Sequence, residues 1–128
     1  MLRRTILLVI LLVVAGKYGL DYLLSPEFQA YGDRHKAQWT CQVNNTFGGF
    51  FEIGSEYERA LDLYGKVLTR CPETSYAEYA MFHKAVCLDS MTHMSDALAA
   101  YQAYLEAYPE GIKRPSALRA ADRIRLAR

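Results

Sequence analysis

Hydrophobic residues form one continuous run near the start of the chain and a spaced, helical pattern from about residue 41 onward. The run lies within residues 1–24 and has about the length that a bilayer-spanning helix needs. Lys17 and Asp21 interrupt it near its far end, where a lysine amine can reach the membrane surface and pair with a carboxylate four residues on. Tyr18 and Tyr22 are of a type enriched at that surface. We therefore expect residues 1–24 to form a transmembrane anchor.

A cleaved signal peptide is the alternative for this segment. Arg3 and Arg4 followed by the apolar residues 6–16 resemble its basic and hydrophobic regions. No A-x-A cleavage site follows, which favours an uncleaved span over residues 5–24. Because the arginines precede the span, the N-terminus is expected in the cytoplasm. The C-terminal domain would then lie in the periplasm, or on the exoplasmic side of another membrane.

Residues 25–40 are expected to link the anchor to the rest of the chain. Ser25 followed by Pro26 is typical of a helix start, since serine caps the first turn and proline suits its first position. The segment up to Thr40 is short and polar. We interpret it as a juxtamembrane helix or linker.

Two stretches in residues 41–128 repeat the same residue types in register. Ala97 follows Ala60 by 37 residues, and Pro109 follows Pro72 by the same interval. A fixed period of this size indicates a helical repeat. Apolar residues of the first stretch step by three and four, as on one face of a helix. They are Tyr57, Ala60, Leu61, Tyr64, Val67 and Leu68.

Each of these helices is preceded by a partner, so that the repeat is a pair of helices. The partners are predicted over 41–53 and 76–88. Short polar turns at 54–55 and 90–92 separate them from the second helices, as in antiparallel hairpins. Proline stops each second helix because the residue before a proline avoids helical geometry.

A last amphipathic helix is predicted over residues 116–126, after a loop. Solenoids need such a terminal helix with a polar outer face. Positive charge is concentrated here, with Asp122 as the single acid from Lys113 onward. Cations suit the C-terminal end of a helix dipole, but the same charge could contact an acidic partner or anionic lipid.

This pattern resembles the tetratricopeptide repeat (TPR) family. Its alanine, bulky ring and proline are matched by one set in each unit, Ala60, Tyr64, Pro72 and Ala97, Tyr101, Pro109. Phe47-Gly48 and Phe51 fit the family's first helix in unit one, whereas unit two keeps only Ala85 and Leu88. The aromatic-rich segment at the end of a unit, such as residues 105–109, looks similar to that of bacterial cell-envelope members of the family, the Tol-Pal coordinators and outer-membrane assembly proteins. The expected fold is all-α, with an N-terminal transmembrane helix, two TPR-like hairpins and a C-terminal capping helix.

Composition and motifs argue against several functions. The formal net charge of +1 speaks against a nucleic-acid binder held by bulk charge. There is no G-x-S-x-G motif and no Gly-rich phosphate loop, so we expect no catalytic residues, no enzyme and no cofactor. His83 and Cys87 are spaced i, i+4 on one helix, which can bind a metal. Most such pairs are coincidental, so no metal site is expected.

The three cysteines suggest a covalent link within the first hairpin. Cys41 opens its first helix and Cys71 closes its second, and these ends are neighbours in an antiparallel hairpin. A Cys41–Cys71 disulfide would suit an oxidising periplasm. The alternative is that both are small buried hydrophobes.

The resemblance implies a non-catalytic interaction or scaffold subunit of a bacterial envelope complex. TPR-like units bind protein partners on the surface lined by their first helices. The residues of that surface, named below, could instead pack against the linker helix. A secreted periplasmic adaptor and a metal or redox accessory protein using His83 and Cys87 are the alternatives. The expected partner-binding residues are Gln42, Asn45, Glu52, Tyr79, Phe82 and Val86, with Gly49 beside them.

Overall fold

A computed structural model describes the backbone of residues 2–34 and 38–127, and the side chains of residues 6–32 and 38–127. Within these ranges the chain forms seven helices and no strands, which confirms the all-helical class. The chain divides into two compact units, Met1–Thr40 and Cys41–Arg128. Residues 35–37 of the predicted linker, and the side chains of Arg3 and Arg4, lie outside the described residues.

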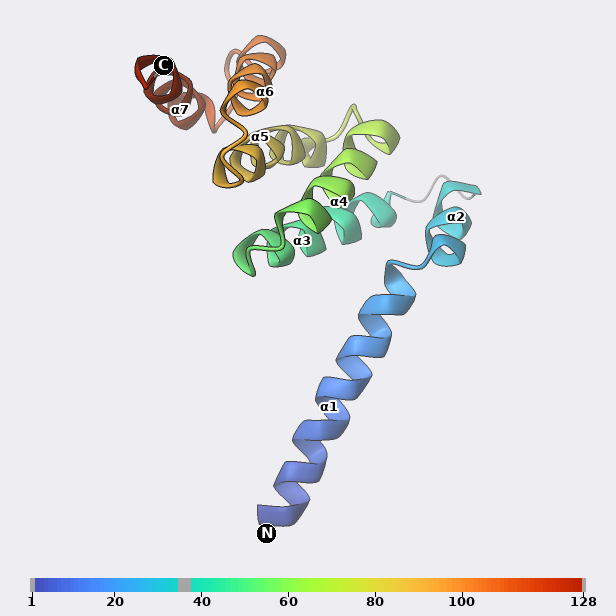
Figure 1. Cartoon of the computed structure of the whole chain (residues 1–128). Helices are drawn as coiled ribbons and strands as arrows, with labels where there is room; N and C mark the ends of the chain where they lie inside the picture. Colours follow the sequence, from blue (N-terminus) through green and yellow to red (C-terminus); the bar gives the residue numbers. More distant parts are fainter. Residues whose placement is uncertain (1, 35–37, 128) are drawn as a thin grey trace. The chain divides into compact units, whose positions relative to one another are not determined.

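The first unit contains the long helix α1 (Leu2–Leu23) and the short helix α2 (Pro26–Arg34) (Figure 1). α1 contains a window, Ile6–Leu23, that is long and apolar enough to cross a membrane. None of this window is buried inside the protein, and its large apolar residues from Ile6 to Val14 are 42% to 72% exposed. A helix that hides none of its apolar surface in a protein core fits a membrane span or a signal segment.

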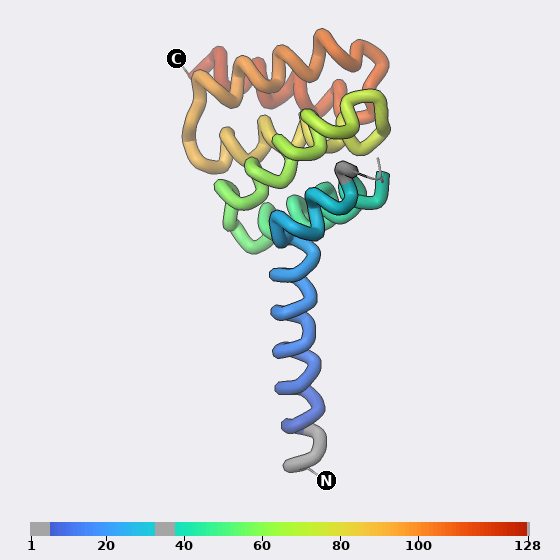
Figure 2. The backbone as a smooth tube through the Cα atoms, turned by 90° about the vertical axis from the view of Figure 1, so that its right-hand side faces the viewer, coloured from blue at the N-terminus to red at the C-terminus, as the bar shows by residue number. Residues whose placement is uncertain are grey.

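The second unit is a series of helices in which each packs against the next (Figure 2). α5 packs on both α4 and α6, and α7 packs on α6. α3 joins the series through α4, because a Cβ on its Gly48 would lie only 2.7 Å from the ring of Tyr64. The helices are α3 (Trp39–Ile53), α4 (Tyr57–Arg70), α5 (Ser75–Ser90), α6 (Met94–Ala107) and α7 (Arg114–Leu126).

The core of this unit is built from small residues and tyrosines. Ala60 and Ala97, the repeated alanines, are both fully buried, which lets helix backbones approach closely. On α4 the buried leucine is Leu63, whereas the predicted Leu61 is only half-buried. The apolar face is therefore rotated slightly from the one that the sequence predicted. Other core residues are Phe82, Ala85, Tyr101, Tyr104, Ala117, Ala121 and Ile124.

The turns inside the two hairpins have the same backbone structure, 37 residues apart. Glu56 N–H donates to the Phe51 carbonyl, and His93 N–H donates to the Leu88 carbonyl in the same way. This six-residue closure is the Schellman motif, which places the preceding residue in the left-handed region. That residue is Ser55 with φ 62° in the first turn and Thr92 with φ 61° in the second. The 37-residue period is thus present in the turns as well as in the core.

Replacing Thr92 with glycine should stabilise the second unit. A β-branched residue at positive φ is strained, and relief of that strain outweighs the extra chain entropy of glycine. We expect the free energy of unfolding to rise by about 1 kcal/mol, measured by urea denaturation of the full chain in mild detergent. Thr69, inside α4, is the control: its replacement by glycine should lower stability. Equal destabilisation by both changes would contradict the strained turn.

Candidate functional site

A polar cluster joins the two hairpins between α3, α4 and α5. The Glu52 carboxylate, at the end of α3, accepts a hydrogen bond from the Tyr64 hydroxyl of α4 at 2.9 Å. Nδ1 of His83 on α5 lies 2.8 Å from the same oxygen, Oε2. The Cys87 thiol, one turn further along α5, is 4.0 Å from it. A single carboxylate therefore connects three helices.

The cluster reaches the surface through Tyr79. Its ring stacks on His83, with the centroids 3.9 Å apart and an angle of 23° between the planes. Tyr79 is 36% exposed, whereas Tyr64 and Cys87 are fully buried. The side chains of His83 and Glu52 are 16% and 17% exposed. The stacked pair thus forms a partly exposed aromatic surface beside a half-buried carboxylate.

Burial and the carboxylate together keep the neighbouring groups neutral. Burial raises the pKa of Tyr64, and the hydrogen bond to Glu52 raises it further. Burial, with a smaller effect of Glu52, also raises the pKa of Tyr79. The pKa of Cys87 is raised to about 12 by burial and then by Glu52. Cys87 is therefore a protonated thiol at neutral pH and a poor nucleophile.

Cys87 should consequently resist alkylation in the folded protein. With iodoacetamide at about pH 8, Cys87 of the folded chain should be labelled slowly, because its thiol is neutral at that pH and is shielded from solvent. We expect labelling to rise at least tenfold in denaturant, read by mass spectrometry without reductant. Rapid native labelling of Cys87 would contradict the buried, neutral thiol.

The side chains around His83 and Cys87 are arranged for hydrogen bonding. Among the residues whose side chains are described, no group of three or more His, Cys, Asp or Glu is placed to hold a metal ion. Nδ1 of His83 faces Glu52. Nε2 of His83 is buried, and no hydrogen-bond partner lies near it in the described part of the chain.

The residues predicted to bind a partner have different positions in the structure. Gln42 is exposed and Tyr79 partly exposed, while Val86 is half-buried against the core. Glu52 belongs to the polar cluster. Asn45 is half-buried, and its Oδ1 has no hydrogen-bond partner within the described residues.

Phe82, another of the residues predicted to bind a partner, has little exposed surface. It is 8% exposed and packs against Tyr101 and Tyr104 of α6, with ring centroids 6.0 and 5.6 Å away. It therefore belongs to the core. His83, the next residue, instead contacts Glu52 and Tyr79 in the polar cluster. The i, i+4 spacing of Tyr79 and His83 could have indicated this stacked pair, but the contact of His83 with Glu52 crosses 31 residues and has no local signal.

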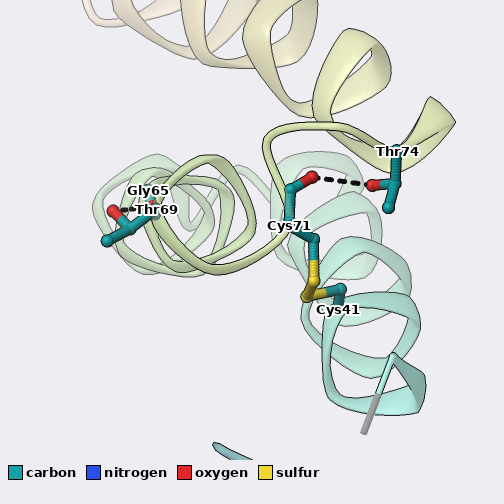
Figure 3. Close-up of a disulfide and its surroundings, with 5 residues drawn as sticks. All are labelled: Cys41, Gly65, Thr69, Cys71 and Thr74. Atoms are coloured by element: carbon teal, nitrogen blue, oxygen red, sulfur yellow. Dashed lines mark hydrogen bonds between the residues drawn. A yellow bond between two sulfur atoms is a disulfide. The ribbon is translucent and has the colours of Figure 1, made fainter. Parts of the chain in front are cut away.

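The outer end of each hairpin is closed by a different chemistry. In the first, Cys41 and Cys71 are joined in a disulfide with their Cα atoms 6.4 Å apart (Figure 3). Glu78 lies 37 residues after Cys41, and its Oε1 accepts hydrogen bonds from the Tyr104 hydroxyl at 2.9 Å and the Ile112 N–H at 3.0 Å. Burial and the bond to Glu78 raise the pKa of Tyr104 to about 12, so this hydroxyl stays a donor. In the second hairpin, these hydrogen bonds of Glu78 thus form a polar clamp at the position that the disulfide has in the first hairpin.

Three arginines of the basic helix α7 bond to other side chains of the same chain. Arg123 pairs with Asp89 of α5, and Arg125 pairs with Asp122 at 3.0 Å. Arg119 donates to the Ser116 hydroxyl at 3.3 Å. The first of these pairs also supports the packing of the last helices.

Comparison with known proteins identifies one repeat. Residues 79–111 match the tetratricopeptide repeat family model. The match covers most of α5, all of α6 and the following turn. This is the second repeat, whose first helix has fewer of the family's motif residues than the first helix of the first repeat. Neither a curated protein nor a solved structure matches the chain significantly. The match supports a TPR-like helical repeat, which typically mediates protein–protein interaction rather than catalysis.

Proposed function

We infer that the chain is a membrane-anchored, TPR-like scaffold subunit of a bacterial cell-envelope complex, without catalytic activity. The observation that carries this proposal is the combination of a repeat matching the TPR family at 79–111 with helix α1, whose apolar window is not buried inside the protein. A repeat domain supplies the binding surface, and α1 supplies the attachment. The partner is a protein, and nucleic acid and cofactors have no part in the proposal.

Anchoring is supported by the exposure of α1. Its window Ile6–Leu23 is apolar and unburied, so in water it would expose a large apolar surface. Burial of that surface in lipid removes the cost. Arg3 and Arg4 precede the window, which favours a cytoplasmic N-terminus and a periplasmic repeat domain. An oxidising periplasm would also sustain the Cys41–Cys71 disulfide.

Partner binding is assigned to the surface formed by α3 and α5. Tyr79 offers a partly exposed ring held rigid by its stack on His83. Rigid aromatic side chains are frequent hot spots, because they bury much area at little entropic cost. Asn45 Oδ1 and His83 Nε2 have no hydrogen-bond partner among the described residues, and a bound segment could supply one. The exposed Gln42 extends this surface.

The experiment is a pull-down of the full chain from membranes in mild detergent, with mass spectrometry. We expect one set of envelope proteins, whose recovery falls about tenfold in Tyr79→Ala, as for a moderate hot spot. Glu106→Ala, an exposed change on α6, is the matched control and should leave recovery unchanged. Recovery of the chain alone in every mild detergent would contradict the scaffold role.

Two alternatives are distinguished by direct measurements. A secreted periplasmic adaptor would have lost its N-terminal segment, so the mature mass would lack residues of α1. A metal or redox accessory protein using His83 and Cys87 would carry a stoichiometric metal in elemental analysis of the purified protein. The basic helix α7 could add contacts to an acidic partner or anionic lipid through Arg114 and Arg119, which are exposed.

A further inference from the structure

Three aromatic rings are in contact from the last turn of α1 to the start of α3. Tyr22 of α1 lies 5.0 Å from Phe28 of α2, and Phe28 lies 4.7 Å from Trp39 at the start of α3, measured between ring centroids. All three belong to the first compact unit. We call Tyr22, Phe28 and Trp39 the aromatic ladder. Tyr22 is 64% exposed, and Phe28 and Trp39 are half-buried.

The ladder begins where the apolar part of α1 ends. The window Ile6–Leu23 has 18 residues. At about 1.5 Å per residue it is roughly 27 Å long, close to the ~30 Å thickness of the hydrocarbon layer. Tyr22 is in the last turn of this window, so the ladder falls at the level of one membrane surface. Tyrosine and tryptophan favour that level because one end of each ring is polar.

The backbone between α1 and α2 is closed by hydrogen bonds of its own. Gln29, which is 3% exposed, donates from Nε2 to the Leu23 carbonyl at 2.8 Å. Ser25 Oγ accepts from the Phe28 N–H at 3.3 Å. Helix ends leave carbonyls and amides without intrahelical partners, and these are costly where water is scarce. A corner that satisfies them internally suits the boundary of a bilayer.

Two more exposed tyrosines lie on the same two helices, α1 and α2. Tyr18 lies one turn earlier on α1 and is 71% exposed, and Tyr31 on α2 is 50% exposed. The exposed part of such rings gains from insertion between lipid headgroups. We propose that the aromatic ladder lies in the headgroup layer of the bilayer and holds α2 there. This inference rests on the proposed anchoring by α1.

Trp39 allows a direct test because it is the one tryptophan in the sequence. The full chain is reconstituted into phosphatidylcholine vesicles whose lipids carry bromine either near the headgroup or near the bilayer midplane. Bromine quenches tryptophan fluorescence at short range. We expect headgroup-proximal bromine to quench Trp39 at least twofold more than midplane bromine.

A depth control uses the same chain with W39F and V14W. Val14 lies in the middle of the apolar window, so its replacement should show the opposite preference, with stronger quenching by midplane bromine. Phe28→Ala removes the middle ring and should weaken quenching of Trp39 while leaving α1 inserted. Flotation of vesicles on a density gradient reports insertion of each variant separately.

The outcomes separate the ladder from the anchor. Failure of the unaltered chain to float with vesicles would reject the anchor and the ladder together. Flotation with the V14W control quenched from the midplane, but Trp39 quenched by neither lipid, would overturn the ladder alone. Preferential quenching of Trp39 from the midplane would also overturn it, because the ring would then lie inside the hydrocarbon.

Discussion

Loss of the Cys41–Cys71 disulfide is expected to lower the free energy of unfolding of the repeat domain by about 3–4 kcal/mol. The bond joins residues 30 positions apart, and restriction of a loop of that length in the unfolded chain gives this magnitude. Urea denaturation of the full chain in mild detergent, followed by circular dichroism with and without reductant, measures the change. The Cys41→Ala/Cys71→Ala variant should match the reduced protein.

The same double variant is the control for effects of the reductant that do not act through the Cys41–Cys71 disulfide. Reductant should not change its stability further, because Cys87 is then the one remaining cysteine and is not in a disulfide. Thiol counting under denaturing, non-reducing conditions should give one free thiol in the unaltered chain. Three free thiols would show that the bond does not form, and an unchanged midpoint on reduction would show that it does not contribute to stability.

Gly48→Ala is expected to destabilise the first hairpin by about 1–3 kcal/mol through overpacking. The added methyl would lie 2.7 Å from Tyr64 Cε1 and 3.0 Å from Cδ1 and Cζ. The ring cannot easily move, because it is fully buried and its hydroxyl is bonded to Glu52. Displacement of Tyr64 would also disturb the polar cluster between the hairpins. Urea denaturation with circular dichroism again provides the measurement.

Gly49→Ala is the matched control for this change. A methyl at Gly49 would meet its nearest atom, the Tyr79 hydroxyl, at 3.6 Å, which is ordinary van der Waals contact. Alanine is also the better helix former by about 0.5–1 kcal/mol. Gly49→Ala should therefore be neutral or stabilising. Similar effects of the two neighbouring substitutions would contradict the close approach of α3 to Tyr64.

Local patterns in the sequence were sufficient to predict helices and turns. The polar turn residues at 54–55 and 90–92 indicated where the structure has turns between helices. The 37-residue period recurs there, because Ser55 and Thr92 both have positive φ in the same kind of turn. Proline at 72 and 109 follows the ends of α4 and α6. These features depend on residues within one turn or one helix, whose effects are local.

Contacts between distant residues were harder to predict. Periodicity placed Phe82 on the inner surface, but α5 packs on both α4 and α6 and buries it. The Glu52–His83 contact and the clamp of Glu78 on Tyr104 depend on how helices pack, which a one-dimensional pattern does not specify. The Cys41 and Cys71 positions could be paired in advance because a hairpin brings its two ends together.

Site-specific photo-cross-linking in intact membranes tests most directly the claim that α3 and α5 present a protein-binding surface on a membrane-anchored chain. A photoreactive phenylalanine analogue replaces Gln42 or Tyr79 on that surface, or Glu106 on α6 as the control; all three are exposed. We predict a discrete cross-linked protein adduct in the membrane fraction from Gln42 and Tyr79, and none from Glu106. Adducts absent from both surface positions, or equally strong from Glu106, would contradict the account.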